Sequence, residues 1–264
     1  MLLTIDVGNT ETKLGCFSAS GELAHTWRVT TDVRRTPDEY GAFFMQLFAS
    51  GGIDARAFDA VAIASVVPKL DPVLETVCAR FFGAKPLFLK PQTQTLIPMG
   101  TAYPEESGAD LVAAAIGGRA RFGAPLIVVS YGTATVFIAI SGTGEYLGVA
   151  IAPGITISID ALIGRTAKLP QIALEMPERA IGRTTNAALQ AGIVYGFAGQ
   201  TEAIVTRMRA ELGEPAKVVA TGGLAELFAK HTPVVDAVDP HLSLAGLRLF
   251  YESVHGQGTS SEVP

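Results

Sequence analysis

The sequence predicts an α/β protein made of two domains with the same architecture. A strand–turn–strand pattern at residues 2–17 recurs at residues 126–140, and the turn of each copy begins with a glycine, Gly8 or Gly132. The length of 264 residues suits two domains of roughly 130 residues each. We expect the domains at residues 1–115 and 116–255, followed by a disordered tail at residues 256–264.

Composition narrows the class of protein. Apolar residues make up 48% of the chain and charged residues 17%, which predicts a large core and a buried oligomer interface. No apolar run reaches the ~18 residues of a membrane helix, and Asp6 interrupts the N-terminal apolar run, so neither a membrane span nor a signal peptide is expected. A net charge of −5 gives no reason to expect nucleic-acid binding. Cys16 and Cys78 lack metal-ligand spacing and are interpreted as reduced core residues of a cytoplasmic protein.

The first turn, Asp6-Val7-Gly8-Asn9-Thr10, carries the first functional pattern. A carboxylate at a strand end followed by Gly and Asn suits a tight turn with free backbone N–H groups. Such a turn can hold phosphate oxygens while Asp6 holds a divalent cation. A plain hairpin without a ligand remains the alternative at this point.

The second turn repeats the pattern with one change. Aligning Gly132 with Gly8 places Ser130 at the position of Asp6. Two hairpins that grip one phosphate chain resemble the arrangement of the actin-like ATPase and sugar-kinase superfamily.

The rest of the first half of the chain predicts an antiparallel meander followed by alternating helices and strands. Thr36 is the expected N-cap of a helix, with Pro37 at its first position and Glu39 as the acid of a capping box. This order resembles a ribonuclease-H-like half-domain. The expected elements are strands at residues 21–29, 59–66 and 85–89 and helices starting at Pro37 and spanning residues 68–81.

Asp110 is the main candidate for proton transfer. It falls in the first turn of a helix predicted at residues 109–121, with Ser107 as its cap. An acidic residue there is favoured by the helix dipole alone. The alternative is a general base that points into the cleft between the two hairpins.

The second half contains a third strand ending near residue 151 and a long helix at residues 186–212. Because glycine costs about 1 kcal/mol in a helix, Gly192 and Gly196 predict close packing there. Thr221-Gly222-Gly223 follows a strand at residues 217–220 and lets backbone approach a flat ligand or a phosphate. Further helices are expected at residues 155–162 and 242–254.

With these motifs in place, the sequence resembles the type III pantothenate kinases from Met1 to about Val254. The resemblance implies ATP-dependent phosphorylation of the terminal hydroxyl of pantothenate, the first step towards coenzyme A. It also implies two ribonuclease-H-like domains with the active site in the cleft between them, a homodimer with active sites at its interface, Mg²⁺ with ATP, and an activating monovalent cation, K⁺ or NH₄⁺. The motifs that carry it are Asp6-Val7-Gly8-Asn9-Thr10, Trp27-Arg28 with Thr31, Ser65-Val66-Val67-Pro68, Gly108-Ala109-Asp110, Gly132-Thr133-Ala134-Thr135, Pro153-Gly154, Thr166-Ala167 with Leu169-Pro170, Gly182 with Thr185, Gln190-Ala191-Gly192 with Gly196, and Thr221-Gly222-Gly223-Leu224-Ala225.

The same resemblance assigns roles to residues. Asp110 accepts the proton of the hydroxyl, and Asp6 orders Mg²⁺. The residues expected to bind ATP and its phosphates are Asp6, Gly8, Asn9, Thr10, Lys13, Gly132, Thr133, Thr221, Gly222 and Gly223. The residues expected to bind pantothenate are Tyr103, Gly108, Ala109, Asp110 and Thr185, with Arg165 or Thr166 added from the partner subunit.

Two positions depart from the family pattern. The family usually has Arg after the catalytic Asp, where this chain has Leu111, and Asp at the monovalent-cation site, where this chain has Ser130. Serine offers a neutral oxygen, so a weaker cation site is expected. The departures leave two alternatives to a pantothenate kinase: a weak or inactive homologue that binds ligands as a regulator, and a kinase of another small hydroxylated substrate.

Overall fold

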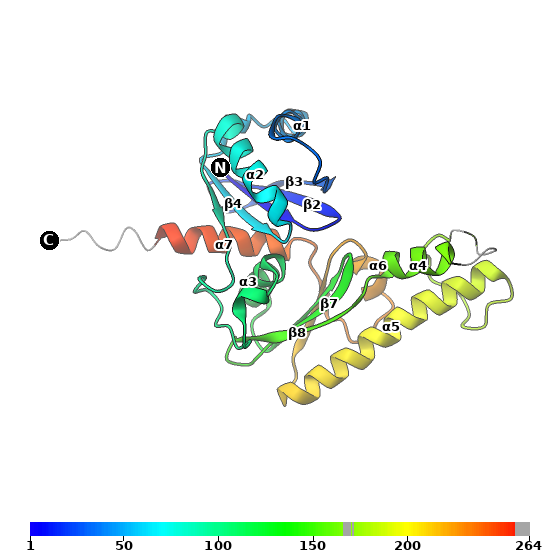
Figure 1. The fold of residues 1–264 in the computed structure, drawn as a ribbon. Helices are drawn as coiled ribbons and strands as arrows, with labels where there is room; N and C mark the ends of the chain where they lie inside the picture. Colours follow the sequence, from blue (N-terminus) through cyan, green and yellow to red (C-terminus); the bar gives the residue numbers. More distant parts are fainter. Residues whose placement is uncertain (166–169, 171, 257–264) are drawn as a thin grey trace. The chain divides into compact units, whose positions relative to one another are not determined.

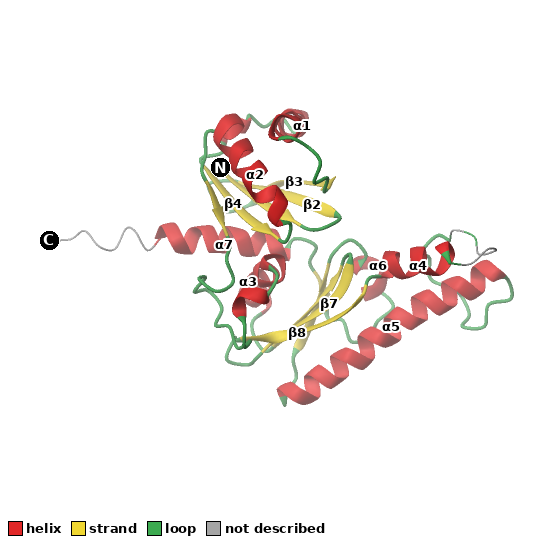
Figure 2. Cartoon of the chain, in the orientation of Figure 1, coloured by secondary structure: helices red, strands yellow, loops and turns green. Residues whose placement is uncertain are grey.

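Two five-stranded mixed sheets form the framework of the computed structural model, which describes residues 1–165, 170 and 172–256 (Figures 1 and 2). Contacts divide the chain into two compact units. Unit 1 holds Met1–Gly117 and the chain from Leu242 on, and unit 2 holds Gly118–His241.

The sheet of unit 1 has the order β3-β2-β1-β4-β5. β1 pairs antiparallel with β2 and parallel with β4, so the meander and the crossover strands meet at β1. This confirms the meander predicted at the start of the chain. The strands are β1 (Leu2–Val7), β2 (Glu11–Phe17), β3 (Leu23–Thr30), β4 (Ala60–Ser65) and β5 (Pro86–Phe88).

The two faces of β1 have different partners. Leu3, Ile5 and Val7 alternate along the strand and join one buried core with the aromatic side chains of α1 (Pro37–Ser50). The opposite face, which carries Thr4 and Asp6, is the one on which α7 (Leu242–Gly256) contacts β1. Polar residues of β1 therefore lie under the C-terminal helix.

The helix predicted from Thr36 begins as expected. Thr36 Oγ1 accepts a hydrogen bond from Glu39 N at 3.3 Å, and Thr36 N donates to Glu39 Oε2 at 2.7 Å, which is a complete capping box. The predicted helix at residues 68–81 is divided into η2 (Pro68–Leu70), α2 (Asp71–Val77) and a π-helical turn, η3 (Cys78–Phe82).

Unit 2 repeats the sheet order as β10-β9-β6-β7-β8, with β6 in the place of β1. β6 pairs antiparallel with β7 and parallel with β9, as β1 does with β2 and β4. The repeated architecture expected from the two hairpins is thus confirmed, while the short edge strand β10 was not predicted. The strands are β6 (Leu126–Tyr131), β7 (Ala134–Ile140), β8 (Tyr146–Pro153), β9 (Lys217–Thr221) and β10 (Ala237–Val238).

The helices outside the first core lie close to their predicted ranges. They are α3 (Ala109–Phe122), α4 (Ile155–Gly164), α5 (Thr185–Leu212), α6 (Ala225–Ala229) and α7. Short 3-10 turns, η1 (Ala55–Ala57) and η4 (Pro104–Glu106), precede β4 and α3. Within residues 1–165 and 172–256, no helix combines the length and apolarity needed to cross a membrane.

The compact units differ from the predicted domain ranges mainly in α7. The sequence places residues 242–255 in the second domain, whereas α7 makes contacts with β1, β4 and β2 of unit 1. Leu242, Leu244 and Leu247 of α7 are buried. A C-terminal helix can join the first sheet because tertiary burial, rather than chain order, decides where an apolar helix face packs.

Two glycines of α5 have no close packing neighbour among the described residues of this chain, so the close packing expected there stays a prediction. Among the described residues, no heavy atom outside the helix itself and its chain neighbours lies within 4 Å of a Cβ placed on Gly192 or Gly196. The buried face of α5 is formed instead by Ala191, Val194 and Ala198. The two glycines therefore lie on the exposed side of the helix.

Close helix packing occurs where α3 crosses α7. A Cβ on Gly246 would meet the carbonyl oxygen of Ala113, and a Cβ on Gly117 would meet the carbonyl oxygen of Leu242. The two backbones touch because neither glycine has a side chain. We expect Gly246→Ala to lower the free energy of unfolding by about 1–3 kcal/mol, since the helices must separate.

Urea unfolding followed by circular dichroism measures this change. The matched control is Gly199→Ala on α5, where a Cβ meets open space. The control should be neutral or stabilising by up to about 1 kcal/mol because alanine is the better helix former. Equal stabilities of the two variants would show that the crossing tolerates a methyl group.

Candidate functional site

Asp6 lies at the C-terminal end of β1, and its side chain is almost fully buried. Ser243 Oγ donates a hydrogen bond to Asp6 Oδ2 at 2.6 Å. Lys13, directly opposite Asp6 in the β1–β2 register, has its Nζ 3.5 Å from the same oxygen. Within the described part of the chain both contacts converge on Oδ2, which leaves Oδ1 as the oxygen suited to a cation.

The first turn is held in shape by its own backbone and by two threonines. Gly8 N donates to Glu11 O at 3.0 Å, so this N–H closes the hairpin instead of being free as the sequence suggested. Thr31 Oγ1 donates to Gly8 O at 2.7 Å and lies 2.8 Å from Thr12 Oγ1. Asn9 and Thr10 are exposed at the tip of the turn.

Asp110 is the second residue of α3 and lies in unit 1, the unit that also contains Asp6. Leu111 N donates to Asp110 Oδ1 at 2.8 Å, and a Cβ on Gly108 would lie 2.5 Å from that oxygen. Glycine at 108 thus leaves room for the carboxylate. Burial, followed by the nearby negative charge of Asp6, raises the pKa of Asp110 to about 6. A carboxyl with a raised pKa beside a second carboxylate suits a general base.

The second turn, in unit 2, is one residue shorter than the first turn, counted between the last paired residues of the two strands. Val7 pairs with Thr12 in the first hairpin, and Tyr131 pairs with Thr135 in the second. Gly132 N donates to Ala134 O at 3.1 Å and closes this turn.

Two glycines bring other loops against the second turn. A Cβ on Gly154, at the start of α4, would meet the carbonyl oxygen of Thr133. Gly222 has a φ of +96°, and a Cβ there would meet the carbonyl oxygen of Tyr131. The Thr221-Gly222-Gly223 turn therefore approaches the end of β6, as glycine permits. Ser130 is half-buried at this end and pairs with Thr221 in the parallel register.

The residues expected to bind pantothenate are divided between the units. Tyr103, which is 61% exposed, precedes Gly108, Ala109 and Asp110 in unit 1. Arg165 and Thr185 are exposed in unit 2, at the end of α4 and the start of α5. Thr166 lies outside the described residues.

The donor set in unit 1 fits Mg²⁺ held together with a nucleotide. Magnesium is usually bound by one or two carboxylates plus substrate phosphates and water. Among the described residues no group of three or more His, Cys, Asp and Glu side chains could hold a metal ion by itself. Asp6, with Oδ1 available, and nearby Asp110 match the smaller set.

Sequence reasoning missed Ser243, although it found Asp6. The two residues are 237 positions apart, and a lone serine near a helix start carries no pattern that points to a carboxylate elsewhere. The helix predicted at residues 242–254 places Ser243 in a first helical turn but does not indicate its partner.

Comparisons with known proteins identify the family of this chain. The family model for type III pantothenate kinase matches residues 2–207. A type III pantothenate kinase from Moorella thermoacetica is 50% identical over 252 residues, which cover 96% of this chain and 99% of the relative. A type III pantothenate kinase from Myxococcus xanthus is 48% identical over 255 residues, which cover 97% of this chain and 99% of the relative.

Solved structures support the fold. A Baf family transcriptional activator from Campylobacter jejuni superimposes with a TM-score of 0.61 at 18% identity, covering 96% of this chain and 99% of that one. A 2-dehydro-3-deoxygalactonokinase from Sinorhizobium meliloti superimposes with a TM-score of 0.58 at 11% identity, and the match covers 96% of this chain and 99% of that one. At these identities the likeness concerns the fold alone. The full-length match to the curated relatives, together with the two hairpins and the Asp6–Asp110 arrangement, shows that this chain belongs to the type III pantothenate kinase family.

Proposed function

We propose that this kinase transfers the γ-phosphoryl group of ATP to the terminal hydroxyl of pantothenate and forms 4'-phosphopantothenate, the first step towards coenzyme A. The observation that carries the proposal is the placement of Asp110, with its raised pKa, near Asp6 in a chain about half identical to curated pantothenate kinases. The regulatory alternative has only Leu111 and Ser130 in its favour.

Asp110 acts as the base in this proposal. It accepts the proton of the pantothenate hydroxyl as the oxygen attacks the phosphoryl group. The hydrogen bond from Leu111 N keeps Oδ1 in a fixed position, and the missing side chain at Gly108 keeps that position open. Tyr103, Ala109 and Thr185 would contact pantothenate, with Arg165 or Thr166 added by the partner subunit.

The nucleotide is bound mainly by backbone and by small residues. Asn9 and Thr10 would face its phosphates in unit 1, and Lys13 supplies a positive charge beside Asp6. Gly8 contributes through the turn geometry rather than through its own N–H. Mg²⁺ bound at Asp6 would supply most of the charge neutralisation that phosphoryl transfer needs. Gly132 and Thr133 would contribute to the phosphate site, and Thr221, Gly222 and Gly223 would flank the adenosine.

A coupled assay of ADP release tests the proposal. The protein is supplied with Mg²⁺ and ATP, with and without pantothenate, and the product is identified by mass. Release that depends on pantothenate supports the proposed reaction. No release would favour the regulatory alternative, and release only with another hydroxylated acceptor would favour a different substrate.

Two further properties belong to the proposal. Cys16 and Cys78 are buried free thiols, and burial raises the pKa of the Cys78 thiol to about 12, which suits a reducing cytoplasm. Binding of a monovalent cation, K⁺ or NH₄⁺, is expected to be weak, because Ser130 occupies the position where the family usually has a carboxylate.

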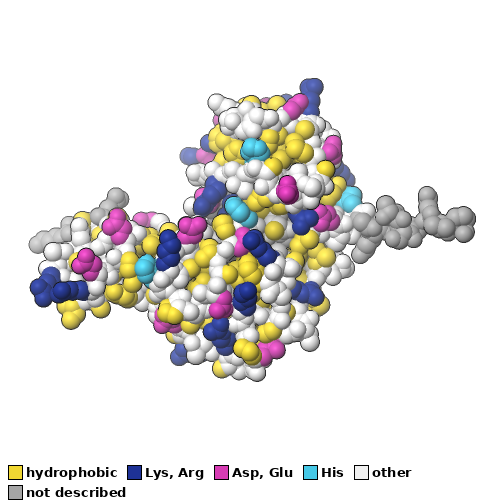
Figure 3. All heavy atoms as spheres, turned by 180° about the vertical axis from the view of Figure 1, so that it is seen from behind, with side chains coloured by type: hydrophobic (Ala, Val, Ile, Leu, Met, Phe, Trp, Pro, Cys, Tyr) yellow, Lys and Arg dark blue, Asp and Glu magenta, His cyan; other side chains and the backbone are white. Residues whose placement is uncertain are grey.

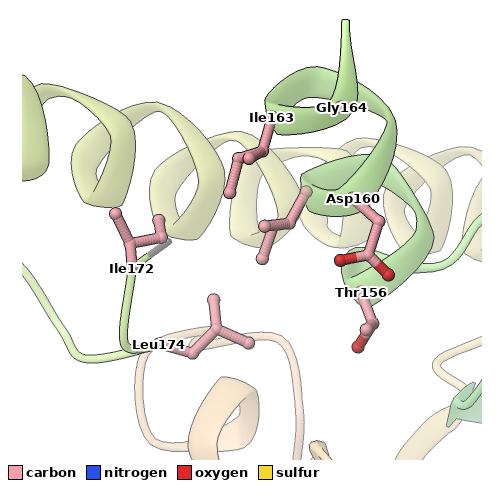
Figure 4. A pocket seen from close by; sticks show the side chains of 7 residues that line it. Thr156, Asp160, Ile163, Gly164, Ile172 and Leu174 are labelled. Atoms are coloured by element: carbon pink, nitrogen blue, oxygen red, sulfur yellow. The ribbon is translucent and has the colours of Figure 1, made fainter. Parts of the chain in front are cut away.

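A homodimer completes the proposed enzyme. Unit 2 exposes large apolar side chains on β8, α4 and α5, among them Ile151 at 68% and Ile157 at 48%. Apolar side chains also reach the surface in the space-filling view (Figure 3). Residues of α4 and the segment after it line a hollow of about 420 Å³ whose walls include Ile163, Ile172 and Leu174 (Figure 4). Apolar surface of this kind is typical of a subunit interface.

The exposed glycines of α5 offer a sharp test of the dimer. Gly192 and Gly196 lie one helical turn apart on the exposed side, where they would let a second helix approach closely. We expect native protein to scatter light as a particle of twice 27.6 kDa and Gly196→Glu to be monomeric with reduced turnover.

Because a Cβ at position 196 meets open space, the variant chain should fold with native or higher stability. Thr206→Glu adds the same charge further along α5 and should remain dimeric. A native protein that is a fully active monomer at assay concentration would contradict the dimer.

A further inference from the structure

The first turn of α7 reaches the candidate metal site. Ser243 is the second residue of this helix, and its Oγ donates to Asp6 Oδ2 at 2.6 Å. Both side chains are buried, at 6% and 5% exposure. A short hydrogen bond to a buried carboxylate is stronger than one between neutral groups.

The bond leaves the two oxygens of Asp6 in different situations. A serine hydroxyl has a single proton, and this one is directed to Oδ2, the oxygen that Lys13 Nζ also faces at 3.5 Å. These two contacts restrain the carboxylate at Oδ2. Oδ1 is the oxygen left to bind a cation.

α7 also docks through contacts other than this bond. Leu242, Leu244 and Leu247 are each no more than 1% exposed, and Gly246 lies against the backbone of α3 at Ala113. These apolar and backbone contacts hold the helix on the sheet. The hydroxyl of Ser243 is therefore available for a role other than packing.

The same helix also connects the two carboxylates. α7 touches β1, whose next-to-last residue is Asp6, and crosses α3, which begins with Ala109 and Asp110. One rigid element thus sets the position of both strand end and helix start. Partners of this kind orient metal ligands in many proteins and affect metal affinity about 10–100-fold.

We propose that Ser243 is a positioning residue that holds Asp6 with Oδ1 directed to the divalent cation accompanying ATP. The inference rests on the proposed function, because Asp6 is the proposed magnesium ligand. Ser243 itself touches neither the cation nor the substrate. Its loss should weaken binding of the cation more than it slows the chemical step.

Binding of Mn²⁺, followed by electron paramagnetic resonance of the free ion, provides a readout that is independent of turnover. The full chain is titrated in the presence of the non-hydrolysable analogue β,γ-imido-ATP. We expect Ser243→Ala to raise the Kd for Mn²⁺ about 10-fold. Ser243→Thr keeps a hydroxyl and should bind Mn²⁺ like the native protein. Ser253→Ala removes a second serine of α7, one that donates to Phe250 O, and is the matched control.

Turnover supplies the second measurement. The Mg²⁺ concentration for half-maximal rate should rise in Ser243→Ala by the same factor, with kcat at saturating Mg²⁺ within about twofold of native. Thermal unfolding in EDTA checks that each variant is folded.

Native Mn²⁺ affinity in Ser243→Ala would overturn the inference, as would equal losses in the Ala and Thr variants. Failure of the proposed function has a different signature. Native protein would then show no pantothenate-dependent ADP release, while the dependence of Mn²⁺ binding on Ser243 persists.

Discussion

Asp110→Asn is expected to lower kcat by about 10²–10⁴-fold while the fold and ATP binding persist. Asparagine keeps the shape of the side chain and can still accept the hydrogen bond from Leu111 N, which is 2.8 Å from Oδ1 in the native protein. It cannot take a proton from the pantothenate hydroxyl. A near-native turnover would remove Asp110 from the mechanism.

The pH dependence gives the same residue a second signature. Burial and the charge of Asp6 raise the pKa of Asp110 to about 6, and a general base acts only when deprotonated. In native protein kcat/KM at limiting ATP should therefore fall about tenfold per pH unit below about pH 6. The residual activity of Asp110→Asn should lack this decline.

Asp110→Asn should raise the free energy of unfolding although it lowers turnover. The pKa of Asp110 is higher in the folded chain than the ordinary value of 3.8, so the folded state binds the proton more tightly than the unfolded state. The cost of the charged carboxylate is present above about pH 6 and disappears as the pH falls towards 4. Asp110→Asn should therefore unfold with a free energy about 1–3 kcal/mol higher than native at pH 8 and with no advantage near pH 4.

Urea titrations in EDTA at the two pH values measure this difference. Glu106→Gln is the matched control, because it removes one carboxylate from the exposed 3-10 turn just before α3. The control should show neither the loss of turnover nor the higher free energy of unfolding at pH 8.

Local signals in the sequence were sufficient for much of the fold. The N-terminal apolar run predicted the buried strand β1, and Thr36 with Glu39 predicted the start of α1. These features depend on residues that are neighbours in the chain. The duplicated turn likewise predicted two equivalent sheets, because each hairpin is a local unit.

Features that depend on distant residues could not be predicted in the same way. The packing of α7 on unit 1 follows from the contact of Gly246 with Ala113, more than a hundred residues earlier. The surroundings of Gly192 and Gly196 could not be predicted either, because a glycine in a helix is equally compatible with a packed face and an exposed one. The hydrogen bond between Ser243 and Asp6 is the functional counterpart, since neither residue indicates the other in the sequence.

The second large effect is expected at Ser130. Ser130 is the next-to-last residue of β6, half-buried, and occupies the place that Asp6 has in β1. Along β6 the residues Ile127, Val129 and Tyr131 face the core of unit 2, so Ser130 points to the opposite face, as Asp6 does in β1. A carboxylate introduced here would stand close to the proposed phosphate site.

Without a monovalent cation, Ser130→Asp should weaken ATP binding about 10–100-fold, because two negative charges a few ångströms apart repel each other in a partly buried site. With K⁺ the repulsion is offset, and turnover should equal or exceed that of native protein. The expected signature is a crossing: the variant is worse than native in choline buffer and as good or better in K⁺. Ser130→Asn has nearly the same size without the charge and should show neither effect.

Turnover is titrated against K⁺ at constant ionic strength, with choline as the replacing cation, for native protein and both variants. Native protein should respond only weakly, since the hydroxyl of Ser130 supplies a neutral oxygen in place of a carboxylate. A native enzyme that already depends strongly on K⁺ would show that other oxygens, such as the backbone carbonyls near Gly132, form the site. The replacement of Asp by Ser at this position would then have no bearing on cation use. The charge that offsets the phosphates would have to come from Lys13 and from the divalent cation proposed at Asp6.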